Sequence, residues 1–223
     1  MRAVIFANGM QERPDLAAGL LRPDDFLISA DGGLRHLRSL GLVPHLLIGD
    51  LDSISPQDEN WLRERQVEAR RYPVDKDFTD LELALQAALQ KGCETILIVA
   101  ALGGRLDQAL ANIALLWLPE LRGVDISLDD GVTEVRLIEH SLTIHGAPGD
   151  TVSLLPLGEA AQGVITHDLK YPLKAETLTI GQTRGISNVM LKDRAAVDVA
   201  EGRLLCVHLR RLDDDEKERN EKE

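Results

Sequence analysis

Aspartates follow two short apolar runs in the first quarter of the chain. Asp31 comes directly after the run at residues 26–30, and Asp50 and Asp52 follow the run at residues 46–49. If both runs are parallel strands of one open sheet, their carboxyl ends lie at the edge where ligands collect. Alternate residues of an extended segment share a face with Cα atoms roughly 6 to 7 Å apart, so Asp50 and Asp52 can flank one ion.

Further aspartates crowd the next polar loop, which contains Asp75, Asp77 and Asp80. Carboxylates that converge without lysine partners repel one another and raise their own pKa values. A hard cation removes that cost, and Mg²⁺ commonly bridges a few carboxylates to substrate phosphates. Any single aspartate can instead cap a turn or a helix. For the group that follows the apolar runs, the shared topology favours a metal site.

A glycine-rich turn is a second place where chemistry is possible. Gly103, Gly104 and Arg105 stand between a predicted strand and a predicted helix. Glycine lets the backbone approach a phosphate, a helix N-terminus supplies N–H donors, and arginine binds phosphate oxygens in a bidentate manner. Such turns also carry glycine for steric reasons alone, so this signal is weak by itself. The chain contains no GxxxxGK[ST], GxGxxG, HExxH or GxSxG motif.

The first half of the chain alternates apolar runs with helical periods, which is typical of βαβ units. Buried parallel strands are predicted at residues 3–7, 26–30, 46–49 and 95–100. Helices are predicted over residues 34–40 and 106–117, and a third helix is capped by Thr79 and ended by Gly92. The pattern predicts an α/β fold with an open parallel sheet and flanking helices.

After residue 131 the helical periods disappear and turn residues become frequent. Short strands are predicted at residues 134–138, 141–145, 151–155, 163–166, 177–180, 195–199 and 204–209. This spacing predicts a small antiparallel β-sandwich or barrel. We therefore expect an α/β domain over residues 1–130, a C-terminal antiparallel β-sandwich domain over residues 131–212 and a disordered acidic tail over residues 213–223.

Composition excludes several classes of protein. The 223 residues carry a net charge of −12 and only 3% are aromatic, so the basic surface and stacking rings of a nucleic-acid-binding protein are missing. The acidity suits a divalent metal or a cationic substrate. Cys93 and Cys206 form no CxxC pattern and are expected to be reduced core thiols. No apolar run approaches a membrane span or a signal-peptide core, so we expect a cytoplasmic protein without membrane contact.

Short motifs follow one another in order along nearly the whole chain. They are ADGG at 30–33, Pro44 with GDLDSI at 49–54, DKDFTD at 75–80 with Glu82, GGRLD at 103–107 with AN at 111–112, LLPLG at 154–158, LKYPL at 169–173 and TRGISN at 183–188. Each motif is short, but the ordered series is specific. It resembles the thiamine pyrophosphokinase family, in particular its bacterial form.

The resemblance implies a Mg²⁺-dependent thiamine diphosphokinase, which moves the pyrophosphoryl group of ATP to the hydroxyl of thiamine and releases AMP. It implies nucleotide and metal binding by residues 1–130, thiamine binding by residues 131–212, and a homodimer with active sites between subunits. The implied metal and catalytic residues are Asp31, Asp50, Asp52 and Asp77, with Arg105 as a further catalytic residue. The implied ATP-binding residues are Asn8, Gly32, Gly33, Asp80, Gly103, Gly104, Arg105 and Asp107. The implied thiamine-binding residues are Thr166, Tyr171, Ser187 and Asn188.

The residue types suit this reaction, because phosphoryl-type transfer needs positioning and charge neutralisation more than a covalent nucleophile. We expect Arg105 to stabilise charge on the transferred group and Asp77 or Asp80 to accept the hydroxyl proton. Tyr171 can stack on the aminopyrimidine or face the thiazolium cation, and a half-buried packing residue is an equally good interpretation. Two other functions stay open: a Mg²⁺-dependent kinase or nucleotidyltransferase acting on another alcohol, and a binding protein without activity.

Overall fold

The computed structural model describes residues 1–52 and 54–212. The chain forms two compact units, of which the first is Met1–Gly131 and the second begins at Val132. The acidic tail predicted over residues 213–223 lies outside the described residues.

The first unit is built on six parallel strands. They are β1 (Arg2–Phe6), β2 (Phe26–Ala30), β3 (Leu46–Gly49), β4 (Glu68–Arg71), β5 (Thr95–Val99) and β6 (Asp125–Asp129). Within this unit the strand order is β6-β5-β1-β2-β3-β4, so the chain moves outward from β1 in one direction and then returns to continue from β5 in the other. The direction reverses between β1 and β5, which is the place where open α/β sheets bind ligands.

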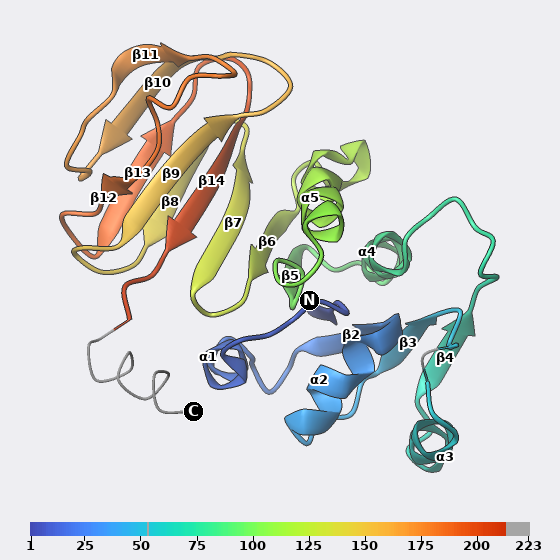
Figure 1. The fold of residues 1–223 in the computed structure, drawn as a ribbon. Coiled ribbons are helices and arrows are strands. Elements are labelled where there is room, and N and C mark those ends of the chain that lie inside the picture. The colour runs from blue at the N-terminus through green and yellow to red at the C-terminus, as the bar shows by residue number, and fades with distance from the viewer. Residues whose placement is uncertain (53, 213–223) are drawn as a thin grey trace. The chain divides into compact units, whose positions relative to one another are not determined.

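Helices cover both faces of this sheet. The helices are α1 (Pro14–Gly19), α2 (Leu34–Ser39), α3 (Pro56–Glu64), α4 (Asp80–Gln90) and α5 (Leu106–Ala114), with 3₁₀ turns at Asp31–Gly33, Leu115–Trp117 and Pro119–Leu121. Figure 1 shows α1, α2 and α3 on one face and α4 and α5 on the other. The strands β1, β2, β3 and β5 are almost fully buried because helices cover them on both sides.

Local sequence signals set the ends of α4. The hydroxyl of Thr79 accepts a hydrogen bond from the backbone N–H of Glu82, which satisfies one of the free donors of the first turn. Leu81, Leu85 and Ala88 form the buried side of the helix. Gly92 follows its end with a φ of +78°, a conformation that glycine adopts without strain. The capped helix predicted from the sequence is confirmed.

The second unit contains two antiparallel four-stranded sheets. Its strands are β7 (Thr133–Ile138), β8 (Ser141–His145), β9 (Thr151–Pro156), β10 (Ala161–His167), β11 (Lys174–Leu178), β12 (Asn188–Val189), β13 (Arg194–Asp198) and β14 (Leu204–Leu209). The sheets have the orders β12-β9-β14-β7 and β11-β10-β13-β8. Buried side chains from both sheets, among them Val152, Leu154, Val164, Val197 and Leu204, form one core. The predicted fold class, a parallel α/β sheet plus an antiparallel sandwich, is confirmed.

Some predicted boundaries are wrong for identifiable reasons. The strand expected at residues 177–180 is Lys174–Leu178, because the chain turns at Gly181 and the N–H of Gln182 donates to the carbonyl of Thr179. Cys93 and Cys206 are free and buried, as expected. Among the described residues, no helix combines the length and hydropathy needed to cross a membrane.

Candidate active site

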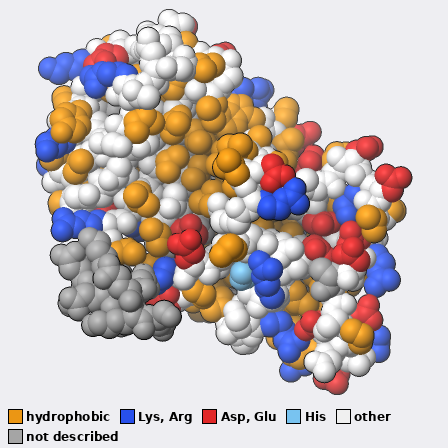
Figure 2. All heavy atoms as spheres, viewed as in Figure 1, with side chains coloured by type: hydrophobic (Ala, Val, Ile, Leu, Met, Phe, Trp, Pro, Cys, Tyr) orange, Lys and Arg blue, Asp and Glu red, His pale blue; other side chains and the backbone are white. Residues whose placement is uncertain are grey.

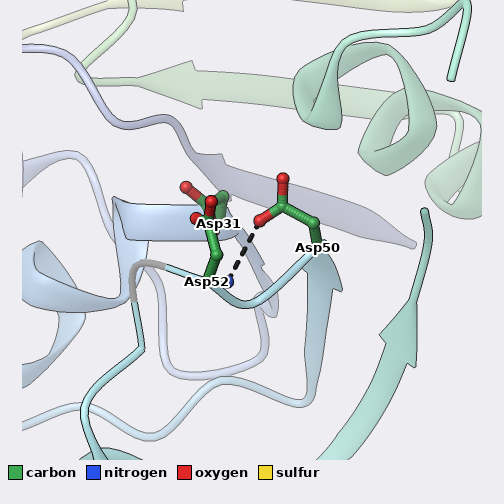
Figure 3. Close-up of side chains that lie close together, drawn as sticks. All are labelled: Asp31, Asp50 and Asp52. Atoms are coloured by element: carbon green, nitrogen blue, oxygen red, sulfur yellow. Dashed lines mark hydrogen bonds between the residues drawn. The ribbon is translucent and has the colours of Figure 1, made fainter. Parts of the chain in front are cut away.

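Three carboxylates converge where β2 and β3 end. Asp31 follows β2 directly, and Asp50 and Asp52 follow β3, the neighbouring parallel strand. One oxygen of each side chain lies within 4.8 Å of the others. Figure 3 shows the three side chains close together. The arrangement brings hard oxygen donors together at the sheet edge, at a spacing that one divalent cation can bridge.

The backbone reaches this arrangement through a turn and not through an extended segment. Leu51 has a φ of +64°, so the expectation that Asp50 and Asp52 alternate along extended chain is wrong. The turn is closed by the carboxylate of Asp50, which accepts a hydrogen bond of 3.1 Å from the backbone N–H of Asp52. A Cβ at Gly49 would lie 3.1 Å from the Cβ of Asp31, so glycine lets the end of β3 approach this aspartate closely.

The charges of this cluster act on one another. The hydrogen bond from the backbone of Asp52 lowers the pKa of Asp50, whereas the nearby carboxylate of Asp50 raises the pKa of Asp52. A lysine lies among these carboxylates. Lys76 Nζ lies 2.9 Å from Asp80 Oδ1, and its positive charge also lowers the pKa of Asp50.

A cavity of about 600 Å³ adjoins the carboxylates. Its walls come from the segments after β1 and β5, on either side of the point where the strand order reverses, and from the loop before α4. The lining residues are Ala7, Asn8, Gly9, Met10, Ala30, Asp31, Asp50, Val74, Lys76, Phe78, Thr79, Asp80, Leu81, Gly103, Gly104, Arg105, Gln108 and Asn112. The lining therefore combines acidic side chains with glycine-rich segments of backbone.

Main-chain contacts join the two glycine-containing walls. The N–H of Gly9 donates to the carbonyl of Ala100 at 2.8 Å, and the N–H of Met10 donates to the carbonyl of Gly103 at 3.3 Å. A Cβ on Gly103 would lie 2.5 Å from the Met10 oxygen, so a side chain there would separate the walls. The close packing explains one of the glycines without any ligand.

Arg105 lines the cavity, but its guanidinium is engaged elsewhere. Its Nε and Nη2 donate to the two carboxylate oxygens of Asp107 at 3.1 and 2.5 Å, and the Arg105 side chain is 74% exposed. Asp107 does not line the cavity. To reach a phosphate in the cavity, Arg105 would have to give up this carboxylate.

Gly32 and Gly33 allow the chain to pack tightly against β1. A Cβ at Gly33 would lie 2.0 Å from the carbonyl oxygen of Phe6, and one at Gly32 would lie 2.5 Å from the side-chain oxygen of Asn8. Gly33 is buried, and of these residues only Asn8 lines the cavity. Gly33 therefore has a structural reason to be glycine.

The loop before α4 contributes side chains that differ from the predicted ones. Asp77 is exposed, and among the described residues it belongs neither to the carboxylate cluster nor to the cavity lining. Asp80 does line the cavity, and burial raises its pKa, an effect that Lys76 offsets only in part. The structure places Lys76 and Phe78 in the cavity as well. Both belong to the DKDFTD motif, but the sequence does not tell which of its side chains turn inward.

In the second unit, two predicted thiamine-binding side chains are used internally. Thr166 Oγ1 accepts from the backbone N–H of Leu173 at 2.8 Å, and both groups are buried. The amide of Asn188 accepts from the N–H of Tyr171 at 2.9 Å and donates to its carbonyl at 2.7 Å. These two side chains hold the segment of chain that carries Tyr171.

The other two predicted thiamine-binding residues are accessible. Tyr171 is 51% exposed, and Lys170 Nζ lies 5.5 Å from the centroid of its ring. Ser187 is exposed with a φ of +56°, and its backbone N–H donates to Ser153 Oγ. Tyr171 and the hydroxyl of Ser187 thus face solvent from a segment that Asn188 fixes.

Two family models match the chain in sequence. "Thiamin pyrophosphokinase, catalytic domain" matches residues 17–148, more than half of the chain, and "Thiamin pyrophosphokinase, vitamin B1 binding domain" matches residues 139–204. The chain belongs to the thiamine pyrophosphokinase family. Asp31, Asp50 and Asp52 lie within the catalytic match, and the segment with Tyr171 and Asn188 lies within the other.

Relatives from bacteria support the assignment to the thiamine pyrophosphokinases. The "Thiamine pyrophosphokinase" of Bacillus subtilis is 30% identical over 204 residues, which cover 87% of this chain and 91% of that one. A crystal structure of thiamine pyrophosphokinase from the same organism has a TM-score of 0.85 and 27% identity, and it covers 95% of this chain. A thiamin pyrophosphokinase family structure from Enterococcus faecalis has a TM-score of 0.79 and 26% identity, also over 95% of this chain. This chain is therefore a transferase of that family.

Proposed function

We propose that the enzyme transfers the pyrophosphoryl group of ATP to the hydroxyl of thiamine, giving thiamine diphosphate and AMP. The observation that carries the proposal is the convergence of Asp31, Asp50 and Asp52 beside a cavity of about 600 Å³ at the reversal of the strand order. Family membership supplies the reaction, and the cavity supplies a place for a triphosphate next to a cation.

The donor set fits Mg²⁺. Three carboxylates offer oxygen atoms within 4.8 Å, and Mg²⁺ is usually bound by one or two carboxylates, waters and substrate phosphates. Asp31, Asp50 and Asp52 would hold the ion, while Asp77, which is outside the cluster, is left out of this set. When bound, Mg²⁺ would neutralise and orient the phosphates of ATP.

The chain itself would bind the nucleotide mainly through backbone groups. Gly103 and Gly104 bring main chain to the cavity wall just before α5, and Asn8 faces the cavity from the end of β1. Backbone N–H groups at such a turn bind phosphate oxygens because they point outward without partners. Asp107 would not contact the nucleotide itself, and its role would be to hold the guanidinium of Arg105.

The transfer step would proceed in line. The bond between the hydroxyethyl oxygen of thiamine and the β-phosphorus forms, and the bond from that phosphorus to the oxygen bridging to the α-phosphate breaks. The electron pair leaves with AMP. Asp77 and Asp80 are the two aspartates considered as acceptors of the hydroxyl proton, and only Asp80 of these two lines the cavity. We therefore propose that Asp80 accepts the proton and then passes it to solvent.

Thiamine recognition is proposed for the segment that Asn188 holds. Tyr171 presents an exposed ring that suits the flat aminopyrimidine, and Ser187, the exposed residue before Asn188, offers a hydroxyl. We assign Thr166 and Asn188 as positioning residues, because their polar atoms already bond the backbone of this segment.

The proposal includes a homodimer with active sites between subunits and a cytoplasmic location. Leu106, Leu110 and Met10 are 73%, 58% and 61% exposed, and Figure 2 shows hydrophobic side chains at the surface over α5. An apolar surface of this kind suits contact with a second copy. The two free, buried cysteines suit a reducing compartment.

The decisive test is to incubate the unchanged protein and the Asp50→Asn variant with thiamine, ATP and Mg²⁺ and to identify the nucleotide that each releases. We expect the unchanged protein to release AMP and the variant to lose turnover by about 100-fold or more, because a charged ligand is removed while the shape is kept. Asp24→Asn, at an exposed aspartate, is the matched control and should leave the rate unchanged. Release of ADP would indicate an ordinary kinase, and near-normal AMP formation by Asp50→Asn would refute the metal role.

A further inference from the structure

Lys76 is the lysine that the cavity encloses. Its side chain is only 13% exposed, and Nζ lies 2.9 Å from Oδ1 of Asp80, whose side chain is 25% exposed. The ammonium also acts electrostatically on Asp50, one member of the carboxylate cluster. A positive charge is thus placed inside the cavity, beside the proposed metal site.

The other cation that lines the cavity is placed differently. Among the described lining residues, Lys76 and Arg105 carry the positive charges. Arg105 is 74% exposed, and its guanidinium is occupied by both oxygens of Asp107. Solvent screens a charge at such an exposed position, whereas a partly enclosed ammonium acts on its neighbours more strongly.

A triphosphate brings more negative charge than one divalent cation removes. Lysine is a compact point charge with three donors on a flexible stem, so it can contact several phosphate oxygens and follow them as bonds change. Asp80 holds the stem in place before the nucleotide enters. Fixed charges of this kind lower a barrier because they need no reorganisation during the reaction.

We propose that Lys76 is a catalytic residue that contacts the transferred pyrophosphoryl group, a role that rests on the proposed function. Its ammonium lies against the β- and γ-phosphate oxygens while the bond from the β-phosphorus to the bridging oxygen breaks and the bond to the thiamine oxygen forms. Lys76 keeps its proton throughout, and the hydroxyl proton goes to Asp80, the acceptor proposed above. The role expected for Arg105 from the sequence falls to Lys76.

A purely structural role makes different predictions. Lys76 lies in the loop four residues before Asp80, the first residue of α4, and such a pair can simply stabilise the loop that precedes the helix. In that case the loss of Lys76 would lower the free energy of unfolding slightly and leave the turnover number intact.

The test compares Lys76→Met, which keeps the length of the stem, with Lys76→Arg, which keeps the charge. We expect Lys76→Met to lower kcat by about 100-fold with the KM for thiamine nearly unchanged, as when a charge-stabilising donor is removed. Lys76→Arg should recover part of this loss. Lys91→Met, at the far end of α4, is the control for the loss of one positive charge and should keep the full kcat.

Binding of Mg²⁺-pyrophosphate, measured by calorimetry, gives a readout that needs no turnover. We expect its affinity to fall about tenfold or more in Lys76→Met and to be unchanged in Lys91→Met. A Lys76→Met protein with kcat within threefold of the unchanged protein overturns the catalytic assignment. If the unchanged protein forms no AMP, the proposed function fails by itself, and the pyrophosphate affinity alone decides whether Lys76 is a phosphate ligand.

Discussion

Replacing Asn188 by alanine tests whether this side chain acts by holding Tyr171. The Asn188 amide is 6% exposed and makes hydrogen bonds of 2.9 and 2.7 Å to the backbone N–H and carbonyl of Tyr171. Alanine removes both bonds and leaves both backbone groups without these partners. The segment should then become less stable and its tyrosine less well placed.

The size of the effect follows from these two bonds. A lost hydrogen bond costs about 0.5 to 1.5 kcal/mol, and a buried partner left unsatisfied costs up to about 3 kcal/mol. Half of the Tyr171 surface is exposed, so water can hydrogen-bond in part to the backbone N–H and carbonyl that lose their partner. We expect the free energy of unfolding to fall by about 2 to 3 kcal/mol, roughly the sum of two typical bonds.

Denaturant unfolding and steady-state kinetics together measure this effect. Asn60→Ala removes the same amide from an exposed position on α3 and should change stability by less than about 0.5 kcal/mol. In Asn188→Ala the KM for thiamine should rise and the KM for ATP should stay constant. Tyr171→Ala should raise the KM for thiamine without the stability loss.

The double variant decides how Asn188 acts. If the amide acts only through Tyr171, the two changes are not additive, and the double variant has the KM for thiamine of Tyr171→Ala. Our reasoning is refuted if the two effects on KM multiply, because Asn188 would then contact thiamine independently. It is also refuted if Asn188→Ala is no less stable than Asn60→Ala.

Three further predictions concern stability. Burial alone would raise the pKa of Glu134, but the imidazole of His208, whose Nδ1 lies 3.8 Å from Oε2, and the charge of Arg136 lower it from 4.5 to about 2. Glu134→Gln should therefore cost roughly 3 kcal/mol above pH 4.5 and progressively less as the pH falls towards 2, and a loss that is constant with pH would contradict this. Desolvation opposes the charge on His208, but its carboxylate partners raise its pKa above 6.5. The stabilisation of the folded state by the charged imidazole is therefore complete below pH 6.5 and is lost as the pH rises through the raised pKa. Gly33→Ala should lower stability by about 3 kcal/mol or more in a melting experiment, because its Cβ would lie 2.0 Å from the Phe6 oxygen, whereas Gly19→Ala meets nothing within 4 Å and should be neutral or stabilising.

The sequence predicts those strands that helices bury on both faces. Residues 26–30 and 46–49 are continuously apolar, and both strands have these bounds in the structure. β4 (Glu68–Arg71) was not predicted because it is a largely exposed edge strand that carries three charged side chains. α3 was missed as well, although Ser55 caps it and Pro56 opens it, because the helix has little apolar surface.

The sequence predicts the part of the candidate site that the strand order determines, which is the group of aspartates at the strand ends. Aspartates at the ends of neighbouring parallel strands must lie close together, whichever turn follows them. The inward direction of Lys76 and the outward direction of Asp77 depend on loop dihedrals that no periodic pattern encodes. The same holds for Asn188, because its two hydrogen bonds to Tyr171 cross a sequence separation of 17 residues.

The left-handed backbone at Asp31 and Leu51 lowers the stability of the folded protein. Their φ angles of +45° and +64° are unfavourable for residues with a side chain, by of order 1 kcal/mol each. Because this strain is present in the folded protein without an ion, the aspartates would already be oriented for the cation that we propose they hold. Under that proposal, orientation of the metal ligands would be obtained at the expense of thermal stability, and glycine at either position would relieve the backbone strain.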